Sequence, residues 1–370
     1  MPADTPSTAD TAPSGPPSGR WTRTVAVVVL AALVAGSIFA ASAGYDGGDQ
    51  PERTTVSGVT GNTTVTVSYT TPANGTQRVT VADVDPALSD AQSGWAIVRQ
   101  STLPAAVVDA AGTSGSGIVT VGPWALVGEM STATTTVGNA TLRVVAPNGS
   151  RTDPARKAGF LARFLSPYAF GPALDRPITI LAAPRTLPSR GLMHSDRSGY
   201  VTQHAFWDGE VDSVWIHEYI HGRENVTLAP EMRWFDEAAA KYLTYRVLEE
   251  QYDPVTEADI RTEFATNPTF PDVQLSNASA VAATRADYHR GARLLYAVDA
   301  RIRAGSDGEH TFVDVFRTMN ARDGAISAAK FVRIVERHSG QEERWIHAAM
   351  TQRGNLSTLV EPAGEGVFDD

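Results

Sequence analysis

The chain has 370 residues, a formal net charge of −10 and no cysteine. Its length suffices for two or more domains, and the lack of cysteine excludes disulfide bonds, a thiol nucleophile and thiolate metal ligands. An acidic chain with no basic patch interleaved with aromatic residues argues against a nucleic-acid partner. Only Lys157, Lys241 and Lys330 are lysines among 31 basic residues. An acidic surface with arginine in place of lysine is typical of halophilic proteins, although a high-GC genome is an alternative explanation.

The N-terminal region predicts an export segment. Residues 1–24 are rich in Pro, Ser, Thr and Ala and are expected to be disordered in the cytoplasm. Residues 25–43 are uncharged and would span about 28 Å as a helix, close to the roughly 30 Å of a bilayer core. Arg20 and Arg23 precede this run, which places the rest of the chain outside. The run would be a transmembrane anchor or, if cleaved after Ala43, a signal segment.

A second pattern also indicates export. Seven of the nine asparagines begin an Asn-x-Ser/Thr sequence, where about one or two would be expected by chance. N-linked glycans are therefore expected on the exported chain. The seven positions are Asn62, Asn74, Asn139, Asn148, Asn225, Asn277 and Asn355.

Residues 50–150 predict an antiparallel β-sandwich. Short runs rich in β-branched residues alternate with Gly, Asn, Pro and Asp. We interpret this region as a packing domain in preference to a ligand-binding module. The clearest predicted strands are at 63–69, 78–82, 117–121 and 140–145.

Residues 151–358 predict a second, mostly helical domain, and the acidic residues 359–370 a loose tail. The apolar spacing predicts a strand at 177–183 and a long irregular connection at 250–283. Helices are predicted at 153–165, 230–252, 285–304, 310–320, 326–338 and 341–351.

The stretch His217-Glu218-Tyr219-Ile220-His221 is the strongest chemical signal in the chain. Histidines four residues apart project from one helical face, so both can reach one metal ion, and Glu218 can hold a water against it. Catalytic zinc usually has three protein ligands. Glu237, early in the helix at 230–252, fits as the third, with Asp236 as an alternative. A helical hairpin around zinc is therefore predicted.

This pattern resembles a known family. HExxH followed by Trp-x-x-Glu-Ala is similar to the gluzincin peptidases, and among them to the alanyl and glycyl aminopeptidases. The segment 288–292, Tyr-His-Arg-Gly-Ala, resembles their Tyr-x-Lys-Gly-Ala helix. The resemblance implies an α+β chain with a β domain before a thermolysin-like catalytic domain. It also implies zinc held by His217, His221 and Glu237, Glu218 as general base, and Tyr288 as the donor that stabilises the oxyanion.

One motif departs from this family. Its glutamate that binds the substrate's α-amino group lies before the HExxH helix, where this chain has Gly-Leu-Met-His-Ser-Asp at 191–196. Met193 or His194 takes the place of the glutamate, and neither supplies a negative charge. Asp196 could substitute for it. These three residues are the candidate substrate contacts.

The sequence therefore predicts a zinc metallopeptidase that hydrolyses peptides or proteins outside the cell, anchored in the cell membrane or secreted. Glu218 would be the general base that activates a zinc-bound water. Two alternatives remain open: a strict aminopeptidase with an altered amine-binding site, and a catalytically degenerate cell-surface structural or adhesion protein on a peptidase scaffold.

Overall fold

The computed structural model describes residues 54–111, 115–202 and 211–357. All of them belong to one unit of the chain, Pro51–Asp370. Within these described ranges no helix is both long enough and apolar enough to cross a membrane. The predicted cytoplasmic segment 1–24, the predicted anchor or signal segment 25–43 and the predicted tail 359–370 lie outside the described residues.

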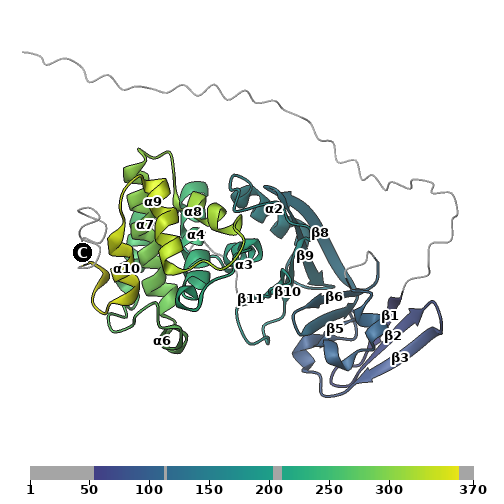
Figure 1. The fold of residues 1–370 in the computed structure, drawn as a ribbon. Coiled ribbons are helices and arrows are strands. Elements are labelled where there is room, and N and C mark those ends of the chain that lie inside the picture. The colour runs from purple at the N-terminus through teal and green to yellow at the C-terminus, as the bar shows by residue number, and fades with distance from the viewer. Residues whose placement is uncertain (1–53, 112–114, 203–210, 358–370) are drawn as a thin grey trace, which may run out of the picture. The chain divides into compact units, whose positions relative to one another are not determined.

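Two antiparallel sheets form the N-terminal part of the described chain (Figure 1). Buried residues of both, among them Val67 and Ile97, belong to one hydrophobic core, as expected for two sheets packed face to face. Short helices η1 (Pro86–Leu88), η2 (Gln100–Thr102) and α1 (Ala105–Val108) connect the strands. The first sheet has the order β1 (Thr55–Thr60), β2 (Val65–Thr71), β3 (Gly75–Val81), and the second the order β4 (Ser89–Asp90), β5 (Trp95–Arg99), β7 (Trp124–Gly128), β6 (Ile118–Val121).

A mixed five-stranded sheet follows. Strand β10 runs parallel to both neighbours, β9 and β12, whereas the two outer pairs are antiparallel. Ile180 of β10 belongs to the core under the helices, and Leu181 to the core of the N-terminal sheets. A strand buried on both faces is a continuous apolar run, which is why 177–183 predicts a strand. The order is β11 (Gly191–Met193), β12 (Ser198–Thr202), β10 (Ile178–Ala183), β9 (Ala140–Pro147), β8 (Met130–Val137).

The predicted domain boundary at residue 150 does not match the sheets. Strands β8 and β9 come before this residue, yet they hydrogen-bond within the sheet that contains β10. Helix α2 (Pro154–Leu165) connects β9 to the parallel strand β10, so the three elements form a βαβ unit that a cut at 150 would divide. The chain passes from one sheet to the next at Glu129, between β7 and β8. The position of this boundary depends on the pairing of strands that are distant in sequence, such as β9 and β10.

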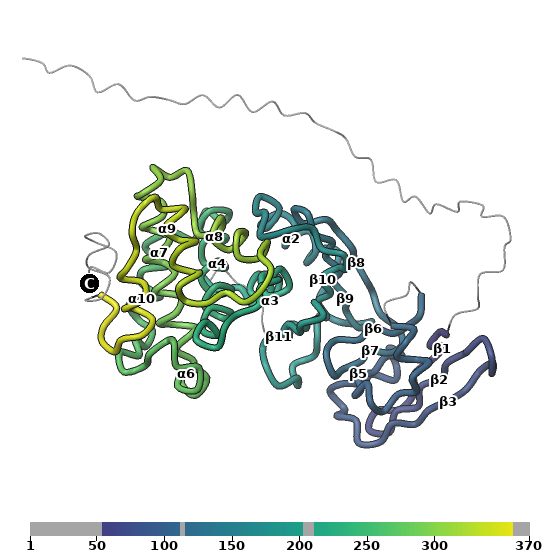
Figure 2. The backbone as a smooth tube through the Cα atoms, viewed as in Figure 1, coloured from purple at the N-terminus to yellow at the C-terminus, as the bar shows by residue number. Residues whose placement is uncertain are grey.

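Helices make up the rest of the described chain (Figure 1). Helix α3 lies between the sheet and the remaining helices (Figure 2). Helices α8, α9 and α10 begin two or three residues later than predicted. The helical elements are α3 (Val214–Arg223), η3 (Pro230–Met232), α4 (Phe235–Gln251), α5 (Glu257–Thr266), α6 (Ala278–Thr284), the π-helical turn η4 (Asp287–Gly291), α7 (Ala292–Gly305), α8 (Phe312–Asn320), α9 (Ala328–Ser339) and α10 (Arg344–Thr351).

The predicted irregular connection at 250–283 is wrong, because it contains α5 and most of α6. Helix α5 buries only Ile260 and Phe264, so its apolar periodicity is weak. Its capping box, in which Thr256 and Asp259 exchange side-chain and backbone hydrogen bonds, was the available signal.

Gly222 lies inside helix α3, near its C-terminal end. The helix ends one residue later, at Arg223. A Cβ at Gly222 would lie 2.7 Å from Cγ2 of Ile178. The glycine therefore allows close packing of α3 against β10, which fixes the distance of this helix from the sheet.

Candidate metal centre

Three donor atoms from helices α3 and α4 meet at one point. Nε2 of His217 lies 3.0 Å from Nε2 of His221. Oε2 of Glu237, in the first turn of α4, lies 3.2 Å from the first nitrogen and 3.3 Å from the second. The two histidines share a face of α3 because they are four residues apart. The structure thus brings together all three residues that the sequence predicts as ligands.

The spacing of these atoms fits zinc. Tetrahedral zinc with bonds of about 2.0 to 2.1 Å holds its donor atoms about 3.3 Å apart. Two imidazole nitrogens and a carboxylate oxygen are also among its preferred ligands. Two imidazole nitrogens only 3.0 Å apart need a proton or a cation between them, because their lone pairs repel. The donor set would therefore hold a zinc ion with little rearrangement.

Glu224 orients the second histidine. Its Oε2 lies 3.1 Å from Nδ1 of His221 and can accept the proton there, which leaves Nε2 free for a metal. Burial lowers the pKa of His221, but Glu224 and then Glu237 outweigh this effect and hold that pKa well above its ordinary value. A metal ion would therefore displace a proton from this site. Glu224 is not among the residues that the sequence predicts for the site, although its position three residues after His221 was a signal.

Asp236 is not the third ligand in this arrangement. It joins Glu224 and the His221 side chain in a separate group of donor atoms. Burial raises the pKa of Glu224, the neighbouring His221 partly opposes this rise, and the hydrogen bond with Asp236 adds to it. Glu237 instead faces both Nε2 atoms. Burial opposes its ionisation, yet hydrogen bonds from His217 and His221 hold its pKa well below the ordinary value.

Glu218 is a buried carboxyl group beside this cluster, on a helix that is buried on almost every side. Its Oε2 has no hydrogen-bond partner. Burial raises the pKa of Glu218 to about 8, and the histidine His221 partly opposes the rise. A Cβ at Gly191 would lie 2.4 Å from Oε1 of Glu218, so this glycine lets edge strand β11 approach the carboxyl group. A buried, unpaired carboxyl group is suited to proton transfer.

The π-helical turn η4 brings Tyr288 to the same place. The Tyr288 ring stacks on His217, with ring centres 5.8 Å apart and an interplanar angle of 9°. Burial raises the pKa of Tyr288, and the adjacent Glu237 carboxylate raises it further, so the hydroxyl keeps its proton. A Cβ at Gly291 would lie 2.8 Å from Cβ of Ala238. The glycine therefore allows this turn to pack against α4 next to Glu237.

The predicted substrate contacts at 193–196 lie on the hairpin between β11 and β12. Met193 is half-buried and packs against the core under the helices. The His194 ring lies against Gly122, in the turn between β6 and β7. Asp196 is exposed, and its Oδ1 accepts hydrogen bonds from the backbone and the side chain of Ser198. Neither His194 nor Asp196 makes a hydrogen bond to the metal-ligand cluster within the described part of the chain.

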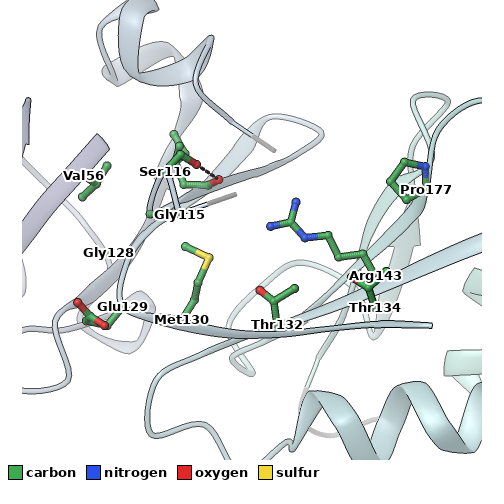
Figure 3. Close-up of a pocket in the computed structure, with 12 residues that line it drawn as sticks. Val56, Gly115, Ser116, Gly128, Glu129, Met130, Thr132, Thr134, Arg143 and Pro177 are labelled. Carbon is green, nitrogen blue, oxygen red and sulfur yellow. Dashed lines mark hydrogen bonds between the residues drawn. The ribbon is translucent and has the colours of Figure 1, made fainter. Parts of the chain in front are cut away.

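A cavity of about 560 Å³ lies away from the candidate metal centre (Figure 3). It is bounded by strands β1, β6, β8 and β9, and the guanidinium of Arg143 points into it. Burial lowers the pKa of Arg143. None of the predicted site residues lines this cavity, so we place the chemistry at the donor cluster, where the reactive groups converge.

Comparison with known proteins shows a likeness of fold. An aminopeptidase N family protein from Idiomarina loihiensis is 15% identical with a TM-score of 0.52, over 72% of this chain and 55% of that one. An M1 zinc metallopeptidase from Deinococcus radiodurans is 18% identical, over 80% of this chain and 61% of that one, with a TM-score of 0.45. Legionella pneumophila aminopeptidase A, in complex with aspartic acid, is 14% identical over 62% of this chain and 29% of that one, with a TM-score of 0.46.

The fold is thus similar to that of the Idiomarina aminopeptidase N family protein, and the chain spans about half the length of that protein. No protein-family profile matches the sequence, and no curated protein is similar to it in sequence.

Lys241 forms an ion pair beside the cluster. Its Nζ lies 2.7 Å from Oδ2 of Asp212, directly before α3, so the pair connects the start of α3 to α4. Ser213 is the N-cap residue of α3, and its side chain makes no capping hydrogen bond. Burial opposes ionisation of Asp212, but the Lys241 ammonium outweighs it and holds the pKa of Asp212 below its ordinary value.

We expect Glu224→Ala to weaken zinc binding about 10- to 100-fold, because His221 loses the carboxylate that fixes its orientation. Competition with a chromogenic zinc chelator measures this change. Glu342→Ala, which removes a glutamate whose side chain is 74% exposed, serves as the control and should leave the affinity unchanged. An unchanged zinc affinity in Glu224→Ala would contradict the assigned role.

We expect Lys241→Met to lower the free energy of unfolding by about 1 to 3 kcal/mol at pH 7, because the Asp212 carboxylate loses its partner. A lowered folded-state pKa stabilises the fold above the unfolded pKa, and this contribution disappears as pH falls through the folded value. The difference between the two proteins should therefore shrink below about pH 4. Urea denaturation at pH 7 and pH 3.5 tests this expectation, with Lys330→Met as a control of constant small effect.

Proposed function

We propose that this chain is a zinc-dependent metallopeptidase that hydrolyses peptide bonds. The main support is that donor atoms of His217, His221 and Glu237 lie within 3.3 Å of one another. A buried carboxyl group, that of Glu218, and the ring of Tyr288 lie beside them. Zinc, when bound, would polarise the scissile carbonyl and increase the acidity of water. Similarity of fold to an aminopeptidase N family protein supports the same class of reaction.

Two side chains of this protein carry out the proton transfers and the charge stabilisation. Glu218 takes a proton from the attacking water and then delivers it to the leaving amine. The hydroxyl of Tyr288 keeps its proton and donates a hydrogen bond to the carbonyl oxygen as this oxygen becomes negatively charged. The buried position of Glu218 keeps the carboxyl group free of other hydrogen bonds at Oε2.

Edge strand β11 is the proposed binding surface for the substrate backbone. It is the outer strand of its sheet and lies beside α3. An extended peptide can add to such an edge through main-chain hydrogen bonds. Leu192, in the middle of β11, has a side chain that is 43% exposed. A peptide paired with this strand would pass Gly191 and therefore Glu218.

The site does not favour a strict aminopeptidase. His194 lies against Gly122, and the Asp196 carboxylate is used within its own hairpin. Within segment 193–196 only Asp196 carries a carboxylate, and its Oδ1 already accepts two hydrogen bonds from Ser198. We infer a peptidase that does not depend on a free N-terminus. A test is to compare hydrolysis of peptides with free and acetylated N-termini, and a requirement for the free amine would overturn this inference.

Zinc removal and substitution of Glu218 test the reaction. We expect one zinc per chain and loss of hydrolysis on treatment with a chelator. Glu218→Gln should keep the zinc and lower kcat about 10²- to 10⁴-fold, because the general base is lost. Tyr288→Phe should lower kcat about 10²- to 10³-fold, because one donor to the oxyanion is lost.

The control for Tyr288→Phe is Tyr69→Phe, which removes a hydroxyl that donates to Gln77 in the N-terminal sheet. It should leave kcat unchanged. Full hydrolysis by Glu218→Gln, or by the chelated protein, would contradict the proposed function.

We also propose that the chain acts outside the cell, at the membrane or after secretion. The apolar run at 25–43 supports this, and all seven asparagines of the Asn-x-Ser/Thr sequences are exposed. Nδ2 of Asn139 donates to the carbonyl of Gly171, so we expect no glycan there, whereas exposed Asn74 and Asn148 should carry one. Mass spectrometry of the chain from its native cells measures glycans and the mature N-terminus. An intact, unmodified chain in the cytoplasm would refute this proposal.

A further inference from the structure

Arg285 is a cation near the candidate metal centre that the proposed reaction does not use. Its guanidinium carbon lies 4.3 Å from the centre of the Tyr288 ring. The same ring stacks on the metal-ligand candidate His217. Arg285 is therefore one aromatic ring away from a residue of the donor cluster.

The guanidinium of Arg285 is available to a ligand. The residue is exposed, and no carboxylate forms an ion pair with it among the residues that the structure describes. The closest carboxyl group in sequence is that of Asp287, whose Oδ1 accepts a hydrogen bond from the backbone N–H of Tyr288. Burial raises the pKa of Asp287 to about 6, and the charge of Arg285 partly opposes this rise without forming an ion pair. A guanidinium packed on an aromatic ring keeps N–H donors for a carboxylate, which it can bind through two parallel hydrogen bonds.

The backbone at Arg285 has a conformation that residues with a Cβ rarely adopt. Arg285 ends helix α6 with φ 58° and ψ 32°, in the left-handed region. Glycine or asparagine would adopt it more readily. This turn connects α6 to the π-helical turn η4 and places Arg285 over Tyr288, three residues later. Backbone strain of this kind is common at functional sites, so the position of Arg285 next to Tyr288 indicates a functional role.

The positive charge of Arg285 favours a negatively charged ligand group. Segment 193–196, which would supply a glutamate for an ammonium group in the resembled aminopeptidases, has only Asp196 here, whose Oδ1 is hydrogen-bonded within its own hairpin. We propose that Arg285 binds a carboxylate of the peptide substrate, close to the scissile bond. This inference rests on the proposed peptidase function and names its substrate class: peptides with an acidic side chain near the cleaved bond, or short peptides with a free C-terminus.

Peptide binding to inactive protein tests this proposal separately from catalysis. The zinc-loaded Glu218→Gln protein is titrated by calorimetry with two matched pairs of peptides. The first pair is acetyl-tetraalanine with a free C-terminal carboxylate and its C-terminal amide. The second pair is an acetylated, amidated tetrapeptide with Glu or Gln at its second position. We expect the acid member of one pair to bind about tenfold more tightly than its neutral partner.

The ratio of affinities should fall to about one when Arg285→Met is added to this background. Arg78→Met is the matched control, because it removes the same charge from an exposed position on β3 and should keep the ratio. The pair that shows the preference identifies the source of the carboxylate. Equal affinities within both pairs, or a preference that survives Arg285→Met, would overturn the proposal. Failure of the proposed function would appear differently, as wild-type protein with zinc and no turnover.

Discussion

The close approach of His217, His221 and Glu237 is the constraint on which the rest of the site depends. Three electron-rich atoms lie within 3.3 Å of one another, so a proton or a cation is needed to hold them together. Their positions are set by helices that pack tightly against other elements. Gly222 lets α3 approach strand β10, and Gly291 lets the π-helical turn approach α4. Packing and charge therefore fix the same geometry.

Burial gives the surrounding charged groups their particular properties. Glu218 has a raised pKa because its helix has little contact with water. Glu224 lies behind His221 and sets which nitrogen faces the cluster. The Lys241–Asp212 pair joins the two helices that supply the metal ligands. Glu224, Asp212 and Lys241 would be unfavourable alone in an apolar region, and their hydrogen-bonded partners stabilise them there, whereas Oε2 of Glu218 has no such partner.

The fold is similar to that of an aminopeptidase N family protein, but the charged residues near the candidate site differ from those of the resembled aminopeptidases. The similarity to an aminopeptidase N family protein concerns the fold, at 15% identity and over about half of that protein. Which residues would contact a substrate depends on the side chains of this chain and does not follow from the fold. His194 packs against Gly122 and has no negative charge to offer a ligand. Arg285 lies over the ring of Tyr288. The proposed peptidase would thus offer a substrate a different charge from that of the resembled aminopeptidases.

The sequence alone determined the features that depend on neighbours along the chain. A spacing of four residues places His217 and His221 on one helical face, and apolar periodicity locates most of the helices. Contacts between distant segments could not be derived in this way. The pairing of β9 with β10 moved the boundary between sheets to Glu129.

The folded chain also decided what each polar group faces. Asp236 and Glu237 are adjacent in sequence, yet only Glu237 points toward both Nε2 atoms. Asp196 is used within its own hairpin, whereas Arg285 is placed over Tyr288 by a left-handed turn. The sequence specified which chemical groups exist and their local spacing, because these follow from covalent connection. Only the tertiary structure decided their partners and burial, because these depend on packing between segments far apart in the chain.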